Sequence, residues 1–123
     1  MQNSFRRMLL SFALTASFGS IAALSPSFAA DPTDAIGQFR SGYLYERGDG
    51  VAKDYKEAMR LYLLSAAQGN AVAQFRIGYL YEKGLGVAQD DTQAMRWYEK
   101  AAAAGNQPAS SRLAVLKIKH SQP

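Results

Sequence analysis

One stretch of this sequence occurs a second time, almost unchanged, further along the chain. Residues 38–48 read QFRSGYLYERG and residues 74–84 read QFRIGYLYEKG, so nine of the eleven residues recur unchanged 36 residues later. The same offset relates Tyr62 to Tyr98 beyond the matched stretch. A fixed period in this range is typical of stacked repeat arrays, in which a single unit cannot bury its apolar face alone. The period therefore predicts an array of like units, a kind of structure that presents extended binding surfaces.

The first 29 residues have the composition of a secretory signal. They contain no Asp or Glu, and two adjacent arginines precede an apolar run over residues 8–24. Ser27 and Ala29 supply the small residues typical of a cleavage site, which predicts cleavage after Ala29. An uncleaved membrane anchor is the alternative, but Ser, Thr and Gly dilute a run that is already short for a span. We expect a secretory signal peptide over residues 1–29 and a periplasmic mature protein, residues 30–123, if the host has an outer membrane.

Cysteine content and charge exclude some classes of function for this protein. The chain has no cysteine, so an exported form depends on core packing alone and cannot carry a lipoprotein anchor. Without the two leader arginines, 12 basic and 10 acidic side chains remain, and the basic ones are spread along the chain. Nothing resembles a nucleic-acid-binding stripe. We therefore expect no nucleic-acid partner and no membrane association after cleavage.

Each repeat reads as two antiparallel helices, A and B. We expect the A helices over about Thr33–Arg47 and Ala71–Lys83, and the B helices over about Tyr55–Gln68 and Asp91–Ala104. Repeat one then covers residues 34–69 and repeat two residues 70–105. Asp54 with Glu57, and likewise Asp90 with Gln93, fits a capping box, in which side chain and backbone satisfy each other at a helix start. Residues 106–120 are in phase with a third A helix and predict a capping helix. The expected fold is all-α, an α-solenoid of two repeats with a cap.

Glycines inside the predicted A helices need an explanation. Gly42 and Gly78 fall in phase, and glycine costs about 1 kcal/mol relative to alanine in a helix interior. We expect close approach of a neighbouring helix to compensate for this cost. Ser41 stands where the second repeat has Ile77, which indicates a half-exposed position or a hydroxyl bonded to the preceding turn.

The segment from Ala73 to Asn106, AQFRIGYLYEKGLGVAQDDTQAMRWYEKAAAAGN, resembles the Sel1-like repeat family. It matches that family's A-x-x-x-L-G-x-x-Y-x-x-G-x-G-V-x-x-D core, its A-x-x-W-Y-x-K-A-A segment and its closing glycine, although Ile77 stands at the first Leu. The first repeat departs from the pattern at Gly37, Ser41, Leu61 and Leu64. The resemblance implies a tetratricopeptide-like solenoid whose A helices line a concave groove. It also implies an adaptor or scaffold, in bacteria often one tied to the cell envelope.

The stripe of the A helices opposite the core is the candidate binding surface. Its arginines offer planar donor forks for carboxylates, and its aromatic rings offer rigid contact area. Together they suit an extended peptide or a ligand that carries a carboxylate. The alternative is that the phenylalanines are core and the arginines pair with Glu46 or Glu82 on the same stripe. The candidate residues are Phe39, Arg40, Tyr43, Arg47, Phe75, Arg76, Tyr79, Lys83 and Arg112.

No set of residues points to catalysis. The single histidine, His120, has no partner at ligand spacing and is expected to be solvated. Asp90 and Asp91 are explained by helix capping rather than by a metal pair. Gly48 and Gly50 indicate a turn, because no Gly-Lys-Ser/Thr follows as in a phosphate loop. We therefore expect no catalytic residue, metal site or cofactor.

The resulting functional hypothesis is a non-catalytic adaptor or scaffold of the bacterial cell envelope that binds a protein or peptide partner. One alternative is a small-ligand-binding protein or an enzyme acting on cell-wall or carboxylate-bearing compounds. Another is a structural module that self-associates as a homodimer, since a short array leaves apolar edges.

Overall fold

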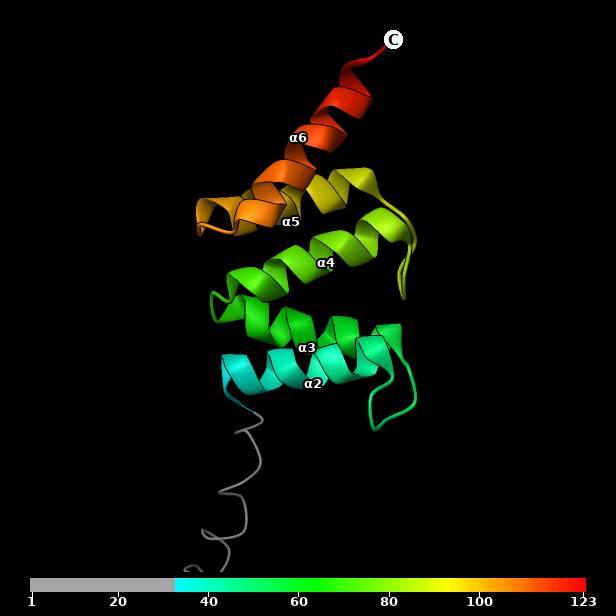
Figure 1. Ribbon diagram of the computed structural model, residues 1–123, viewed down its shortest axis with the longest axis vertical. Helices are drawn as coiled ribbons and strands as arrows, with labels where there is room; N and C mark the ends of the chain where they lie inside the picture. The colour runs from blue at the N-terminus through cyan, green and yellow to red at the C-terminus, as the bar shows by residue number, and fades with distance from the viewer. Residues whose placement is uncertain (1–32) are drawn as a thin grey trace, which may run out of the picture. The chain divides into compact units, whose positions relative to one another are not determined.

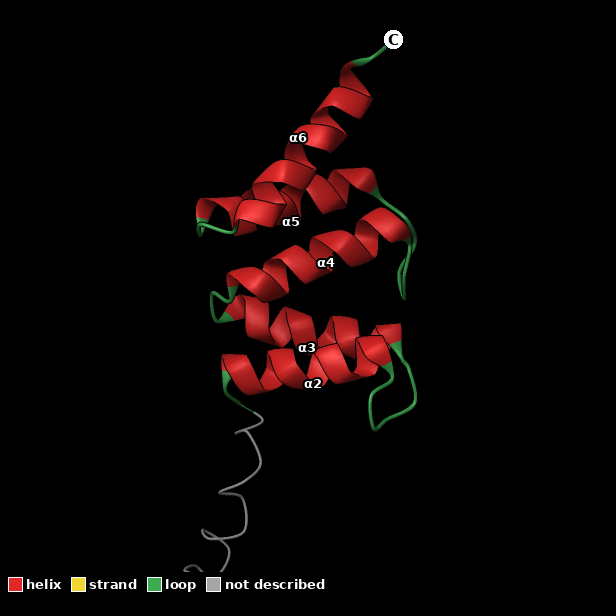
Figure 2. Cartoon of the chain, in the orientation of Figure 1, coloured by secondary structure: helices red, strands yellow, loops and turns green. Residues whose placement is uncertain are grey.

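Five helices and no strand make up residues 33–123, the part of the chain that the computed structural model describes (Figure 1, Figure 2). The predicted signal peptide lies outside the described residues. The helices are α2 (Ala35–Arg47), α3 (Tyr55–Ala67), α4 (Ala71–Lys83), α5 (Asp91–Ala103) and α6 (Gln107–Ser121). This architecture confirms the predicted all-α solenoid.

Helices that follow one another in sequence also pack on one another, from α2 on α3 through to α5 on α6 (Figure 1). The A helices α2, α4 and α6 alternate with the B helices α3 and α5 along this stack. Side chains also reach directly from one A helix to the next, because Arg76 of α4 contacts Glu46 of α2 and Arg112 of α6 contacts Glu82 of α4. No helix within residues 33–123 has the length and apolar character needed to cross a membrane.

Every helix begins at an Asp or Asn whose side chain accepts backbone N–H groups of the first turn, as the sequence predicts for α3 and α5. These N-caps are Asp34, Asp54, Asn70, Asp90 and Asn106. Such caps satisfy donors that have no partner within the helix. Because Asp34 is the cap, α2 starts two residues later than expected. The B helices end one residue earlier than expected, before Gln68 and Ala104.

The reciprocal half of the predicted capping box forms neither at Asp54 nor at Asp90, whose backbone N–H donates to the carbonyl oxygen of Tyr81 at 3.0 Å. The backbone N–H of Asp54 donates instead to the carbonyl oxygen of Tyr45, at 2.9 Å. Since this donor is already satisfied, the Glu57 side chain turns away and pairs with Arg60 at 2.6 Å. A hydrogen bond from the loop back to α2 has replaced the local one.

Two apolar clusters form the core, and each joins a B helix to the A helix that follows it. The first contains Ala58, Met59, Tyr62, Ala66, Ala73, Ile77 and Leu80. The second contains Ala94, Tyr98, Ala101, Ala109 and Leu116. The second cluster shows that α6 covers the apolar face of repeat two, as expected for a capping helix.

The helical glycines lie at the closest approach between helices. A Cβ atom built on Gly42 would lie 2.8 Å from the ring of Tyr62, and one built on Gly78 would lie 2.7 Å from the ring of Tyr98. Both tyrosines are fully buried. The expected close approach of a neighbouring helix at these glycines is therefore confirmed.

Candidate functional site

A polar network joins the two repeats through Glu46 of α2. Its carboxylate accepts a hydrogen bond of 2.5 Å from the Tyr62 hydroxyl and one of 3.2 Å from Nη1 of Arg76. The carboxylate side chain is only 11% exposed. The three residues come from α2, α3 and α4, so the network ties three successive helices together.

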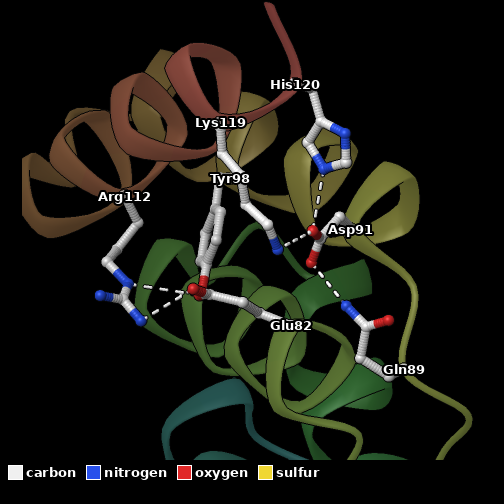
Figure 3. Close-up of polar contacts among 7 residues, drawn as sticks. All are labelled: Glu82, Gln89, Asp91, Tyr98, Arg112, Lys119 and His120. Atoms are coloured by element: carbon white, nitrogen blue, oxygen red, sulfur yellow. Dashed lines mark hydrogen bonds and ion pairs between the residues drawn. The ribbon is translucent and has the colours of Figure 1, made fainter. Parts of the chain in front are cut away.

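The same network recurs one repeat later, at Glu82 of α4 (Figure 3). Tyr98 of α5 donates to Glu82 at 2.6 Å, and Arg112 of α6 donates through Nε at 3.2 Å and through Nη2 at 2.9 Å. Arg112 therefore binds as a two-pronged fork, the stronger geometry. Arg76 uses a single nitrogen, and its guanidinium lies 5.1 Å from the centre of the Tyr43 ring.

The two network tyrosines are hydrogen-bond donors and not acid–base groups. Burial, followed by the hydrogen bond to Glu46, raises the pKa of Tyr62 far above its ordinary value. Burial and the hydrogen bond to Glu82 raise the pKa of Tyr98 in the same way. Both phenols stay neutral throughout the physiological range. Each tyrosine therefore serves its network as a neutral hydrogen-bond donor that links two helices.

The aromatic members of the predicted surface are partly core. Phe39 and Phe75 are half-buried, with ring centres 5.6 Å from those of Tyr62 and Tyr98 respectively. Tyr79 is also half-buried and packs against the first apolar cluster. These three rings are therefore partly exposed to solvent and partly packed against the core.

The cations of α2 and α4 remain accessible, apart from Arg76. Arg40 and Lys83 are exposed and form no ion pair within residues 33–123. Arg47 is exposed, pairs with Asp49 at 2.8 Å and donates to the hydroxyl of Tyr43 at 3.4 Å. The A-helix face, by which we mean the nine candidate residues named above, thus has an accessible basic part and a neutralised, structural part.

A second polar cluster, which the sequence did not predict, fastens the end of α6 to the start of α5 (Figure 3). The Asp91 carboxylate is buried and lies 2.8 Å from Lys119 Nζ, 2.8 Å from His120 Nε2 and 2.6 Å from Gln89 Nε2. Hydrogen bonding to Lys119, and then to His120, lowers the pKa of Asp91 below its usual value. The expectation that His120 is simply solvated is therefore wrong, although its side chain is 49% exposed.

The sequence carried a weak signal for this cluster. His120 lies 36 residues after Gly84, the glycine in the left-handed conformation at which α4 ends. Because histidine stands there instead of glycine, α6 continues past the point where α4 stops. The continuation brings Lys119 and His120 to Asp91, which the sequence suggested only as part of a helix cap. Asp90 alone performs that capping role. Within residues 33–123, no three His, Cys, Asp or Glu side chains gather closely enough to hold a metal ion.

Comparison with known proteins gives a consistent picture. The family model described as Sel1 repeat matches residues 35–70 and 71–106, one residue later than the predicted repeats. The comparison with curated protein sequences gave no match.

The solved structures that are similar to this chain include the following three. The Sel1 repeat protein from Oxalobacter formigenes is 45% identical, with a TM-score of 0.63 over 65% of this chain and 60% of that one. The protein c5321, a protective antigen present in uropathogenic Escherichia coli strains and displaying an SLR fold, is 42% identical. Its TM-score is 0.66 over 68% of this chain and 18% of that one. Helicobacter pylori cysteine rich protein B is 29% identical, with a TM-score of 0.61 over 64% and 59%. The matched part of this chain spans less than two thirds of each of these proteins.

Proposed function

This chain belongs to the Sel1 repeat family, and on that premise we propose that it is a non-catalytic module that binds a protein or peptide partner through the A-helix face. Sel1 repeat proteins are in general protein-interaction scaffolds. The single observation that carries the proposal for this surface is the accessible basic part of the A-helix face. Arg40 and Lys83 have no counter-charge within residues 33–123, and each lies three or four positions along its helix from a half-buried tyrosine, Tyr43 and Tyr79 respectively.

The chemistry of this face favours a partner with carboxylates. Arg47, Lys83 and the two network arginines lie on one side of α2, α4 and α6, and the acidic side chains there, Glu46 and Glu82, are already occupied. An acidic extended segment would gain ion pairs with the free cations and contact area with the ring edges. Arg76 and Arg112 then act as supports that hold the A helices side by side.

A charge reversal at Lys83 tests the surface. We expect Lys83→Glu to abolish capture of the partner from envelope extracts. The melting temperature should fall only slightly, since Lys83 is exposed and unpaired and loses only its favourable place in the last turn of α4. Lys56→Glu is the matched control, because Lys56 is an exposed lysine on a B helix. Undiminished capture by the Lys83 variant would show that the A-helix face is not the binding surface. Arg76 is unsuitable for this test, since its removal leaves Glu46 without its ion-pair partner.

The proposed site of action is the cell envelope, with residues 1–29 as the cleaved export signal. The support is the acid-free, arginine-led apolar pattern of that segment. Mass spectrometry of the protein from the periplasmic fraction should find a chain that begins at Ala30. Full-length protein confined to the cytoplasm would contradict the export proposal and leave the binding proposal standing.

A further inference from the structure

The outer face of α2 is exposed, whereas the equivalent faces of α4 and α6 are each covered by a preceding helix. Leu44, Leu80 and Leu116 occupy the same position on the three A helices, and their exposed fractions are 44%, 0% and 2%. The preceding B helix covers Leu80 and Leu116. Ser41 is half-buried, whereas its counterpart Ile77 is fully buried. The structure itself therefore shows what kind of surface fits over this position, namely a helix pair of the same type.

Arg40 also lacks the partner that its counterparts in the later A helices have. Its counterparts Arg76 and Arg112 each bind a glutamate 30 residues earlier in the chain. The residue 30 positions before Arg40 is Leu10, and residues 1–30 contain no Asp or Glu. This chain therefore has no carboxylate in the register that would neutralise Arg40. A guanidinium whose two equivalents are both paired points to a carboxylate from another molecule.

From these two series we propose that Arg40, Ser41 and Leu44, which we call the leading edge, dock a helical segment of another protein. That segment brings a carboxylate to Arg40 and an apolar side chain to Leu44, as the preceding repeat does at Arg76 and Leu80. The proposal goes beyond the function proposed above, because the A-helix face shares only Arg40 with the leading edge. The docked segment would thus occupy, at α2, the position that the preceding repeat occupies at α4.

The far end of a second copy of this chain does not supply that chemistry. At the far end of the array, Ile118 stands in the register of Glu46 and Glu82, and α6 contains no acidic residue. The acidic side chains on or next to α2 are engaged within their own copy, with Glu46 in its network, Asp49 on Arg47 and Asp34 as the cap of α2. The two ends are therefore not complementary, and copies do not extend one another into a filament.

The test uses the full chain and a pair of helical peptides as probes. One peptide carries a Glu and two Leu side chains on one face, and the other has Lys in place of that Glu. We expect the Glu peptide to shift the NMR signals of the Leu44 methyl groups, and Arg40→Glu to weaken its binding at least about tenfold. The Lys peptide should bind the Arg40→Glu variant better than it binds the wild type. Arg96→Glu, which changes an exposed, unpaired arginine on α5, should alter neither affinity.

Three results would overturn the proposal. The first is a Glu peptide that leaves Leu44 unperturbed, or that binds the Arg40→Glu variant as well as the wild type. The second is a perturbation centred on Leu64, an α3 leucine of matched exposure (43%), or on Lys83 of the A-helix face. The third is a shift of the Leu44 signals with protein concentration alone, which would identify a second copy as the occupant. Lys83→Glu should not affect peptide binding here, so failure of the leading edge and failure of the A-helix face are distinguishable.

Discussion

Replacing Gly78 by alanine should destabilise the protein, although alanine is the better helix former. The added Cβ would lie 2.7 Å from two ring carbons of Tyr98 and 3.2 Å from the carbonyl oxygen of Ala94. Ordinary contacts of this kind begin at 3.4 Å, so the ring must retreat by about 0.7 Å or α4 must move away from α5. The ring has little freedom to retreat, because Tyr98 is fully buried and its hydroxyl is bound to Glu82 at 2.6 Å.

Two terms decide the sign of the effect. Gly→Ala in a helix interior contributes about 1 kcal/mol of helix propensity. Overpacking a filled core costs roughly 1–3 kcal/mol, and the upper part of that range applies where neither the ring nor the backbone can yield. The expected net loss in the free energy of unfolding is therefore about 1–2 kcal/mol. For a domain of about 90 residues this lowers the melting temperature by roughly 5–15 °C.

Thermal and urea unfolding of Gly78→Ala measure this loss directly. Gly42→Ala should change stability in the same direction, because its Cβ would lie 2.8 Å from the Tyr62 ring. In a Tyr98→Phe background the ring is no longer held by Glu82 and can tilt, so Gly78→Ala should cost less there. An unchanged or higher melting temperature for both alanine variants would refute the reasoning, since it would mean that the tyrosine rings yield freely.

Three further predictions concern the polar contacts. Glu82→Gln removes the counter-charge of the Arg112 fork and should cost about 1–3 kcal/mol in urea unfolding, whereas Glu99→Gln, at an exposed pair, should cost almost nothing. Because the folded-state pKa of Asp91 lies below its unfolded value, its stabilisation is present above about pH 4 and is lost as the pH falls. Circular dichroism should show α6 loosening in acid, and Asp91→Asn should remove that pH dependence. Asn106→Ala removes the N-cap of α6 and should cost about 1 kcal/mol in the same unfolding assay.

The fold was predictable from sequence because each stacking contact is repeated with the chain's own period. The offset of 36 residues placed the helix starts, the closing turns and the helical glycines in phase, and the structure confirms the resulting solenoid. The details that differ depend on contacts between elements. At Asp54, a bond to the Tyr45 carbonyl replaced the local capping box, and local spacing gives no information about such a bond.

The candidate site was predictable only as a stripe of residues. The sequence placed Arg76 and Arg112 on that stripe together with Glu46 and Glu82, and left open whether these arginines bind a partner or pair internally. The internal pairing depends on how far one A helix is displaced along the next, and the period does not specify that displacement. The cluster around Asp91 was missed for a related reason, since its basic partners are 28 and 29 residues away and reach it only because α6 continues past the usual helix end.

We infer that the repeated network sets the stacking register more than it adds stability. An ion pair that is largely withdrawn from water loses much of its Coulombic gain to desolvation, so apolar replacement of all its members is often nearly neutral. Small and large apolar side chains, however, tolerate several alignments of two helices. Glu82 is satisfied in one alignment only, in which Tyr98 of α5 and Arg112 of α6 both reach it. A slip of α6 by one turn, about 5.4 Å, would separate Arg112 from that carboxylate.

A triple replacement distinguishes these two roles. Glu82→Leu, Tyr98→Phe and Arg112→Leu together keep the apolar contacts and leave no unpaired charge, so the free energy of unfolding should change little. Amide hydrogen exchange in α6 should nevertheless become faster, because helices held by apolar contacts alone sample neighbouring registers. If exchange in α6 stayed as slow as in the wild type, the apolar clusters alone would be sufficient to define the register, and the network would have no such role.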